Sequence, residues 1–460
     1  MARQSTPGVP TLTRRASKEN QVFRWSSLAR RIRVACFQRV LRQNLTAVVV
    51  ISCAALATQA EELPQTLLLI DEPTVEAVLE AAEQDGGLQF RIGDDLRQIA
   101  RENLVRWSTP AMATAAGEVL LVDGSRLVLA ESWTGQPSLK MDARTVSAAT
   151  KQFGKITFPR VKLRAVLFHA PADVRRRTKQ IDRLLAWRGD DRLLLSNQDV
   201  LTGKLLGIAE NQPADGDHPP GATVVFEADI GKLKLPQARV AGVVCNPGQG
   251  SSSSGALAVG LRDGSYLMAR SLTADAHRLR VELACGVTVS GTNCRDVVYL
   301  QSLAGRLVYL SDIKPADYRH EPYLDIPWPY RTDRNVLGGP LVVDRRWYAK
   351  GLGMHSASRL TYRLEADPTG SRYERFAAEI AVDDAAAGRG SVLFRVYLFR
   401  ANAWQLAYAS PVVRGGEASL PVSVDLKDAR RIALETDYAD HGDERDYANW
   451  LDARLEESNP

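Results

Sequence analysis

Residues 351–358 read Gly-Leu-Gly-Met-His-Ser-Ala-Ser, and this stretch decides the fold of the last third of the chain. It follows a lead-in rich in Trp, Tyr and Gly at 328–340. Apolar and polar residues then alternate at 376–384 and 390–396, which is the period-two pattern of half-buried strands. The sequence Asp-Tyr-Ala-Asn-Trp stands at 446–450, close to the C-terminus. This order of motifs predicts strands and connecting loops.

The same ordered set of motifs resembles the NPCBM family (novel putative carbohydrate-binding module), which is related to the galactose-binding CBM51 modules. The resemblance covers roughly residues 320–456 and implies a jelly-roll β-sandwich that binds sugar without catalysis. Family members usually have Asp-His-Ala-Asp-Trp where this chain has residues 446–450. Tyr447 and Asn449 depart from that pattern, which weakens any role carried over to those two positions.

Four residues are the carbohydrate-binding candidates that the resemblance implies: His355, Asp384, Asp446 and Trp450. Imidazole and carboxylate groups hydrogen-bond to sugar hydroxyls, and an indole ring can stack on the apolar face of a pyranose. Each residue also has a purely structural interpretation. The histidine could bond to a neighbouring loop, the aspartates could hold turns, and the tryptophan could pack in the core.

The middle of the chain, residues 61–316, shows internal similarity. A segment that begins at Phe153-Gly154-Lys155 aligns without a gap onto one that begins at Ile230-Gly231-Lys232. Upstream of the Gly-Lys strand, an Asp-Gly pair, or Ser196-Asn197 in its place, supplies the positive-φ residues of a tight hairpin. We therefore predict three degenerate β-meander units, near 117–170, 190–246 and 256–312.

The predicted fold class is all-β. Degenerate β-meander repeats precede a C-terminal jelly-roll sandwich at 317–460, and a few short helices accompany them. Residues Asp173–Trp187 have the pattern of an amphipathic helix, and Thr74–Ala82 suggest another short helix.

The N-terminal residues 1–60 differ from the rest in charge. Ten basic side chains and the single acid Glu19 give this segment a net charge of +9. Because the whole chain has a net charge of +5, the remaining residues carry −4. A mildly acidic body gives no electrostatic reason to expect nucleic-acid binding.

A 13-residue apolar run at 45–57 follows the basic segment. The run is too short to cross a bilayer of about 30 Å as a helix, but it fits the apolar core of a signal peptide. We predict export to the periplasm, the cell envelope or the medium. Val50-Ile51-Ser52-Cys53 also resembles a lipoprotein box, so membrane contact is predicted only through a lipid anchor on Cys53.

The cysteines and one acidic run are the residues that could form a disulfide or bind a metal ion. Cys285 and Cys294 are close enough to bridge a local loop in an oxidising compartment, and Cys245 is left as a small buried residue. Their spacing does not make a zinc site. The acidic run 437–446 could bind Ca²⁺, although it lacks EF-hand spacing, and otherwise no cofactor is predicted.

No catalytic motif stands out in the sequence: there is no HExxH pair, nucleophile elbow, P-loop or dinucleotide fingerprint. The sequence therefore favours an exported, non-catalytic protein that binds a galactose-type sugar or a cell-surface polysaccharide. Two alternatives stay open. One is a structural or protein-interaction protein of the cell envelope that has no sugar site, and the other is a hydrolase with its active site in 61–316.

Overall fold

The computed structural model describes residues 65–457, apart from 112–116, 132–137, 172, 213–220, 247–254, 292, 324, 365–372 and 441. The predicted signal segment and Cys53 lie outside these residues. Within the described part, no helix combines the length and the apolar character that crossing a membrane requires.

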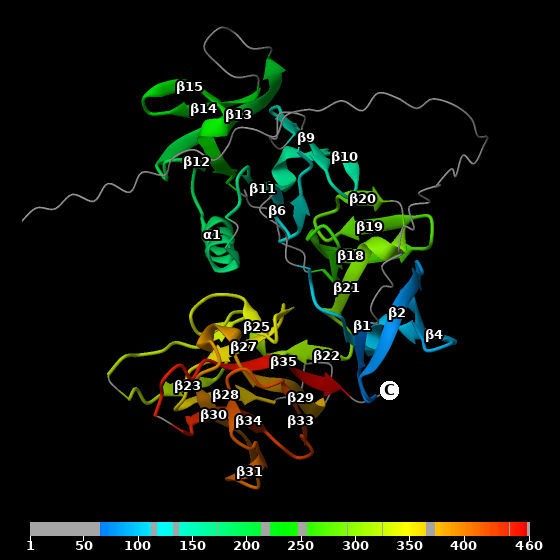
Figure 1. Ribbon diagram of the computed structural model, residues 1–460, viewed down its shortest axis with the longest axis vertical. Coiled ribbons are helices and arrows are strands. Elements are labelled where there is room, and N and C mark those ends of the chain that lie inside the picture. Colours follow the sequence, from blue (N-terminus) through cyan, green and yellow to red (C-terminus); the bar gives the residue numbers. More distant parts are fainter. Residues whose placement is uncertain are drawn as a thin grey trace, which may run out of the picture. The chain divides into compact units, whose positions relative to one another are not determined.

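Residues 65–302 form four units that share one connectivity, coloured blue through green in Figure 1. The first contains β1 (Gln65–Leu69), β2 (Val75–Ala82), β3 (Gly87–Ile92), β4 (Asp95–Ala100) and β5 (Leu104–Trp107). The second contains β6 (Glu118–Leu121), β7 (Arg126–Val128), β8 (Leu139–Met141), β9 (Thr145–Thr150), β10 (Gly154–Pro159) and β11 (Leu163–Leu167).

The third unit contains β12 (Asp191–Leu195), β13 (Val200–Gln212), β14 (Gly221–Ala228), β15 (Gly231–Pro236) and β16 (Val240–Val244). The fourth contains β17 (Leu257–Leu261), β18 (Tyr266–Ala274), β19 (Leu279–Leu283), β20 (Thr288–Gly291) and β21 (Val297–Ser302).

In each unit a single 3-10 turn precedes the last strand, which then pairs antiparallel with the first strand. These turns are η1 (Arg101–Asn103), η2 (Arg160–Lys162), η3 (Gln237–Arg239) and η4 (Cys294–Asp296). The inward-facing side chains of all four units join one apolar cluster. A lone hairpin is marginally stable in water, so this shared core is what lets such short strands persist.

The segment 65–107 was not predicted as a unit. Its first turn reads Asp71-Glu72-Pro73, with Asp71 at φ 64°, where the second and fourth units have Asp-Gly. The helix predicted for Thr74–Ala82 is wrong, because Val75–Ala82 is strand β2. Its Ala, Glu and Leu residues favour helix, but pairing with β1 and β3 overrides that local preference.

The helix predicted at Asp173–Trp187 is present as α1 (Val174–Ala186). The Asp173 carboxylate accepts a hydrogen bond from the Arg176 backbone N–H and so caps the first turn. Ile181 and Leu184 pack into a small cluster with residues of β6, β11 and β16.

The C-terminal part is a β-sandwich, coloured yellow-green to red in Figure 1. One sheet has the order β24-β27-β35-β29-β33, with β22 also paired to β35, and the other has the order β23-β28-β34-β30-β31, with β32 paired to β30. The first sheet contains β22 (Leu307–Tyr309), β24 (Arg331–Thr332), β27 (Gly351–Met354), β29 (Tyr373–Val382), β33 (Leu420–Asp425) and β35 (Ala448–Glu457).

The second sheet contains β23 (Asp317–His320), β28 (Ser358–Arg363), β30 (Ser391–Arg400), β31 (Ala403–Ala409), β32 (Val413–Arg414) and β34 (Arg431–Tyr438). A separate hairpin joins β25 (Leu341–Val343) to β26 (Arg346–Tyr348), and the short turns η5 (Leu310–Asp312) and η6 (Asp384–Ala386) complete the elements. Apolar side chains of both sheets form the core between them. The fold is all-β, as predicted.

Strand β22 lies before residue 317, where the sandwich was predicted to start. It nevertheless belongs to the sandwich, because it pairs with the C-terminal end of β35. A buried polar network also links the earlier units to β35. Arg106 and Gln301 stand opposite each other on β5 and β21, and both donate hydrogen bonds to the Asp452 carboxylate, at 2.7 and 2.8 Å. Buried hydrogen bonds to Asp452 thus connect the sandwich to the units that precede it in the chain.

Cys245, Cys285 and Cys294 are all buried and unpaired in the structure. The disulfide considered for Cys285 and Cys294 does not form. Burial raises the pKa of the Cys245 and Cys285 thiols to about 12, which keeps them protonated.

Candidate functional site

Four ring-bearing side chains gather where β23, β27 and β35 meet their loops, and we call them the aromatic cluster: His320, Trp328, His355 and Tyr447. The His355 ring stacks on Trp328, with 4.7 Å between centroids and an interplanar angle of 4°. Tyr447 and His320 approach the same imidazole at 6.1 and 6.2 Å. Trp328 and Tyr447 are half-buried, so part of each ring faces solvent.

His355 sits in the turn between β27 and β28, which the left-handed residue Ala357 completes at φ 53°. The side chain is buried. Burial lowers the pKa of His355 to about 4, with a further lowering from His320, against an opposing effect of Asp443. At neutral pH the imidazole is therefore uncharged and can donate one hydrogen bond and accept another.

Asp446 precedes Tyr447 and is fully buried. Its Oδ1 accepts from the Ser391 backbone N–H at 2.8 Å, whereas its Oδ2 meets no hydrogen-bond partner among the described residues. Burial raises the pKa of Asp446 to about 6, against the lowering effect of the Ser391 hydrogen bond. The structure thus brings His355 and Asp446 to the same end of the sandwich, where both side chains are buried.

The pKa shifts of His355 and Asp446 act in opposite directions as the pH falls. The lowered pKa of His355 contributes stability that is lost from about pH 6.5 down to 4, while the raised pKa of Asp446 contributes stability that returns between about pH 6 and 4. Asp446→Asn removes the second contribution. We expect the free energy of unfolding of this variant to fall more steeply between pH 7 and 4, by about 2–3 kcal/mol relative to wild type. Urea unfolding at both pH values measures the difference, and parallel curves would contradict it.

Asp384 lies elsewhere. Its carboxylate accepts hydrogen bonds from the backbone N–H groups of Asp344 and Arg345, at 3.0 and 2.8 Å. Both donors have positive φ in the β25–β26 turn. Asp384 therefore holds a strained turn in place, and the structure does not bring it into the aromatic cluster.

Trp450 has no exposed surface. Its indole packs in the core between Phe394 and Phe376, with centroids at 5.1 and 6.1 Å. It offers no face to a sugar in this position, which argues against the stacking role that we predicted for it.

The residues that depart from the family pattern have structural partners. Asn449 donates its side-chain N–H to Asp383 at 2.8 Å, and Asp383 also accepts from Asn335 and from the Val342 backbone N–H. A carboxylate at 449 would set two acids against each other, so the amide suits this position. Tyr447 joins the aromatic cluster. The sequence did not single out His320, and Tyr447 was given little weight because it departs from the family pattern. Trp328 lies in the aromatic-rich segment 328–340 but was not among the predicted binding residues.

Several carboxylates of the acidic run 437–446, where a Ca²⁺ site was considered, form ion pairs with arginines. Asp437 pairs with Arg395, Asp440 with Arg414 and Glu444 with Arg389. Among the residues that the structure describes, no three His, Cys, Asp or Glu side chains are placed to hold a metal ion.

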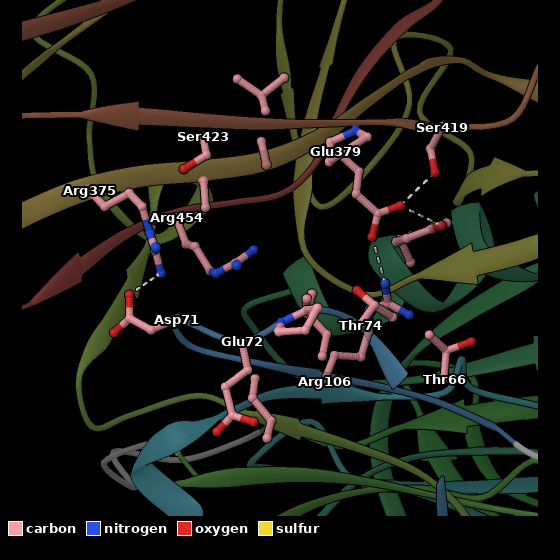
Figure 2. Close-up of a pocket in the computed structure, with 18 of the residues that line it drawn as sticks. Thr66, Asp71, Glu72, Thr74, Arg106, Arg375, Glu379, Ser419, Ser423 and Arg454 are labelled. Atoms are coloured by element: carbon pink, nitrogen blue, oxygen red, sulfur yellow. Dashed lines mark hydrogen bonds and ion pairs between the residues drawn. The ribbon is translucent and has the colours of Figure 1, made fainter. Parts of the chain in front are cut away.

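A cavity of about 620 Å³ lies beside the outer face of β29 and β33, and Figure 2 shows its lining. Arg106 points to Glu379, at 2.9 Å, and Ser419 donates to the same carboxylate. Arg375 is paired with Asp71 at 2.6 Å. Arg106 and Arg375 are thus paired with acids of the protein, whereas Arg346, which also lines the cavity, makes no ion pair with the described residues.

Residues 306–456 match the NPCBM/NEW2 domain family. A putative endo-alpha-N-acetylgalactosaminidase of Renibacterium salmoninarum is 32% identical over 118 residues, which are 26% of this chain and 7% of that protein. An alpha-1,3-galactosidase B of Akkermansia muciniphila is 30% identical over 124 residues, which are 26% of this chain and 15% of that protein. The chain therefore spans a small part of the curated relatives it matches.

Solved structures with CBM51 domains also match. One is a CBM51 of Clostridium perfringens GH95 in complex with methyl-galactose, 23% identical, covering 32% of this chain and 99% of that chain with a TM-score of 0.28. Another contains CBM51-2 of Clostridium perfringens ZmpB with GlcNAc, 19% identical, covering 53% and 45% with a TM-score of 0.29. The resemblance predicted from the motifs is confirmed: residues 306–456 match the NPCBM/NEW2 domain family.

Proposed function

We propose that this protein is an exported, non-catalytic carbohydrate-binding protein whose NPCBM/NEW2 domain binds a terminal galactose-type residue at the aromatic cluster. The observation that carries the proposal is the half-buried Trp328 ring stacked on the neutral imidazole of His355, within a domain of a carbohydrate-binding family. The galactose-type ligand is supported by the two relatives that match this domain, which are named for enzymes acting on galactosides and N-acetylgalactosamine.

The chemistry of the cluster suits a sugar. One face of Trp328 is taken by His355, and the accessible remainder of the ring can lie against the C–H face of a pyranose. His320 Nε2 is buried and has no hydrogen-bond partner among the described residues, so a sugar hydroxyl that reaches it would satisfy it. Tyr323, a few residues before Trp328 in the chain, also has an exposed ring. Each sugar hydroxyl exchanges water for protein, so affinity per site should be modest.

Trp328→Ala should weaken binding of a methyl-galactoside by at least about tenfold, which corresponds to about 1.4 kcal/mol, because the stacking surface is lost. Isothermal titration of the full chain measures it. Trp404→Ala is the matched control, since Trp404 is a more exposed indole on the edge strand β31, away from the aromatic cluster. Equal affinity of both variants and wild type would contradict the proposed site.

A structural role in the cell envelope is the second candidate. The burial of His355, Asp446 and Trp450 favours it, because side chains committed to the interior are not available to a ligand. A glycan array separates the two functions: binding to galactose-terminated glycans supports the first, and no binding to any glycan at millimolar concentration supports the second.

A further inference from the structure

A cavity of about 470 Å³ lies away from the aromatic cluster, beside the β6–β7 turn, helix α1 and strand β18, with sandwich residues completing its lining. The side chains that matter to its chemistry are Arg126, Tyr266, Thr332, Arg334, Trp347 and Lys350. Its volume is within the range of about 300–1,000 Å³ that small-molecule sites occupy.

Arg126 is the unusual member of this lining. Within the part of the chain that the structure describes, its guanidinium makes no ion pair and no hydrogen bond. It lies over the rings of Tyr266 and Trp347, at 5.2 and 5.5 Å from their centroids. Burial lowers the pKa of Arg126, and the effect of Glu118 in the other direction does not compensate. Glu118 is engaged with Arg177 at 2.5 Å.

The other charges of the cavity are matched. Arg334 makes a two-pronged ion pair with Asp182, at 2.5 and 2.8 Å. Lys350 contacts Asp312 at 2.6 Å and Asp333 at 3.1 Å. Among the described residues, Arg126 is thus the cation of this lining that no carboxylate pairs with, while the Asp123 carboxylate, which also lines the cavity, accepts from the backbone N–H groups of Ser125 and Cys285.

A second group is also without its partner. The indole N–H of Trp347 is buried and meets no acceptor among the residues that the structure describes. A buried donor left unsatisfied is destabilising, so such groups call for an explanation. A guanidinium and an indole N–H that both lack an acceptor, in one cavity, point to a ligand that carries acceptors.

The cavity in Figure 2 provides the contrast. There Arg106 and Arg375 each face a carboxylate of the protein, as the dashed lines to Glu379 and Asp71 show. Arg106 and Arg375 are thus each supplied with an acid, whereas Arg126, like Arg346 in that other cavity, makes no ion pair with the described residues.

We propose that the cavity around Arg126 binds an anionic saccharide, with its carboxylate or sulfate group on the Arg126 guanidinium and its ring against Tyr266 and Trp347. Arginine presents a planar fork of donors that matches both anions. The aromatic walls and the volume favour a ring-bearing ligand over a bare inorganic ion. The site shares no residue with the aromatic cluster, so it stands or falls separately from the function proposed above.

Titration of the full chain with methyl glucuronide and methyl glucoside tests the proposal, because the two probes differ in the charged group alone. We expect the glucuronide to bind at least about tenfold more tightly than the glucoside, and its affinity to fall with added salt. Arg126→Gln should weaken glucuronide binding by at least about tenfold, and Arg126→Lys, which keeps the charge without the fork, by less. Arg280→Gln, at an exposed position on β19, should change nothing.

Equal binding of the two probes, or a glucuronide affinity that Arg126→Gln leaves unchanged, would overturn the proposal. Inorganic sulfate that binds as tightly as the glucuronide would overturn its saccharide part. If Arg126→Gln does not fold, as judged by thermal unfolding, Trp347→Phe decides: it keeps a ring but lacks the N–H, and we expect several-fold weaker glucuronide binding. Unchanged binding by that variant would then refute the site. Trp328→Ala should bind the glucuronide normally.

Discussion

Arg106→Met should destabilise the protein by about 3–5 kcal/mol, the cost of leaving a buried charge without its partner. The Arg106 Nε–H donates to Asp452 at 2.7 Å, and both side chains are almost fully shielded from water. A methionine fills similar volume but offers no donor. Burial already raises the pKa of Asp452, and removing the guanidinium would remove the largest opposing effect. Urea unfolding at pH 7 gives the free energy directly.

Two further variants make this result specific. Arg106→Met combined with Asp452→Asn removes the orphaned charge, so we expect it to recover a large part of the loss. Arg97→Met breaks a two-pronged pair with Glu72 that is exposed to solvent, and it should cost about 1 kcal/mol or less. A loss below about 1 kcal/mol for Arg106→Met would show that water reaches Asp452.

Trp450→Ala should cost about 3–5 kcal/mol, because it empties a large part of the sandwich core. The indole packs edge-on against Phe394 and is enclosed on every side. Thermal or urea unfolding measures the loss. Trp404→Ala removes the same side chain from an exposed edge strand and should cost about 1 kcal/mol or less.

A milder substitution separates packing from sugar contact at this position. Trp450→Phe keeps an aromatic ring in the core and should bind methyl-galactoside as wild type does. A selective loss of affinity in a variant that keeps most of its stability would restore Trp450 as a sugar contact.

The fold of the C-terminal domain could be predicted because its signals are local and ordered. Residues 351–358 supply strand β27 and the turn after it, and the alternation at 376–384 marks β29. The segment at 75–82 misled us because helix-favouring residues there pair with two neighbouring strands. Local preference is weak beside such pairing.

The site was harder to predict, because a motif names residues without saying which way they face. Asp383 and Asp384 are adjacent, yet one is a buried hub for Asn335 and Asn449 and the other clamps a turn. Trp450 matches the family pattern, yet its ring lies in the core of the sandwich. Trp328 and His320 lie far from residue 447 in sequence, and only the folded sandwich places their rings together.

The three described cysteines have a practical consequence. Since Cys245, Cys285 and Cys294 are buried and unpaired, this part of the molecule needs no oxidant to mature. It should reach the same state in dithiothreitol as in air, and thiol-directed reagents should find little to modify before the chain unfolds. Heterologous production in a reducing cytosol is therefore a sound route to material for binding measurements.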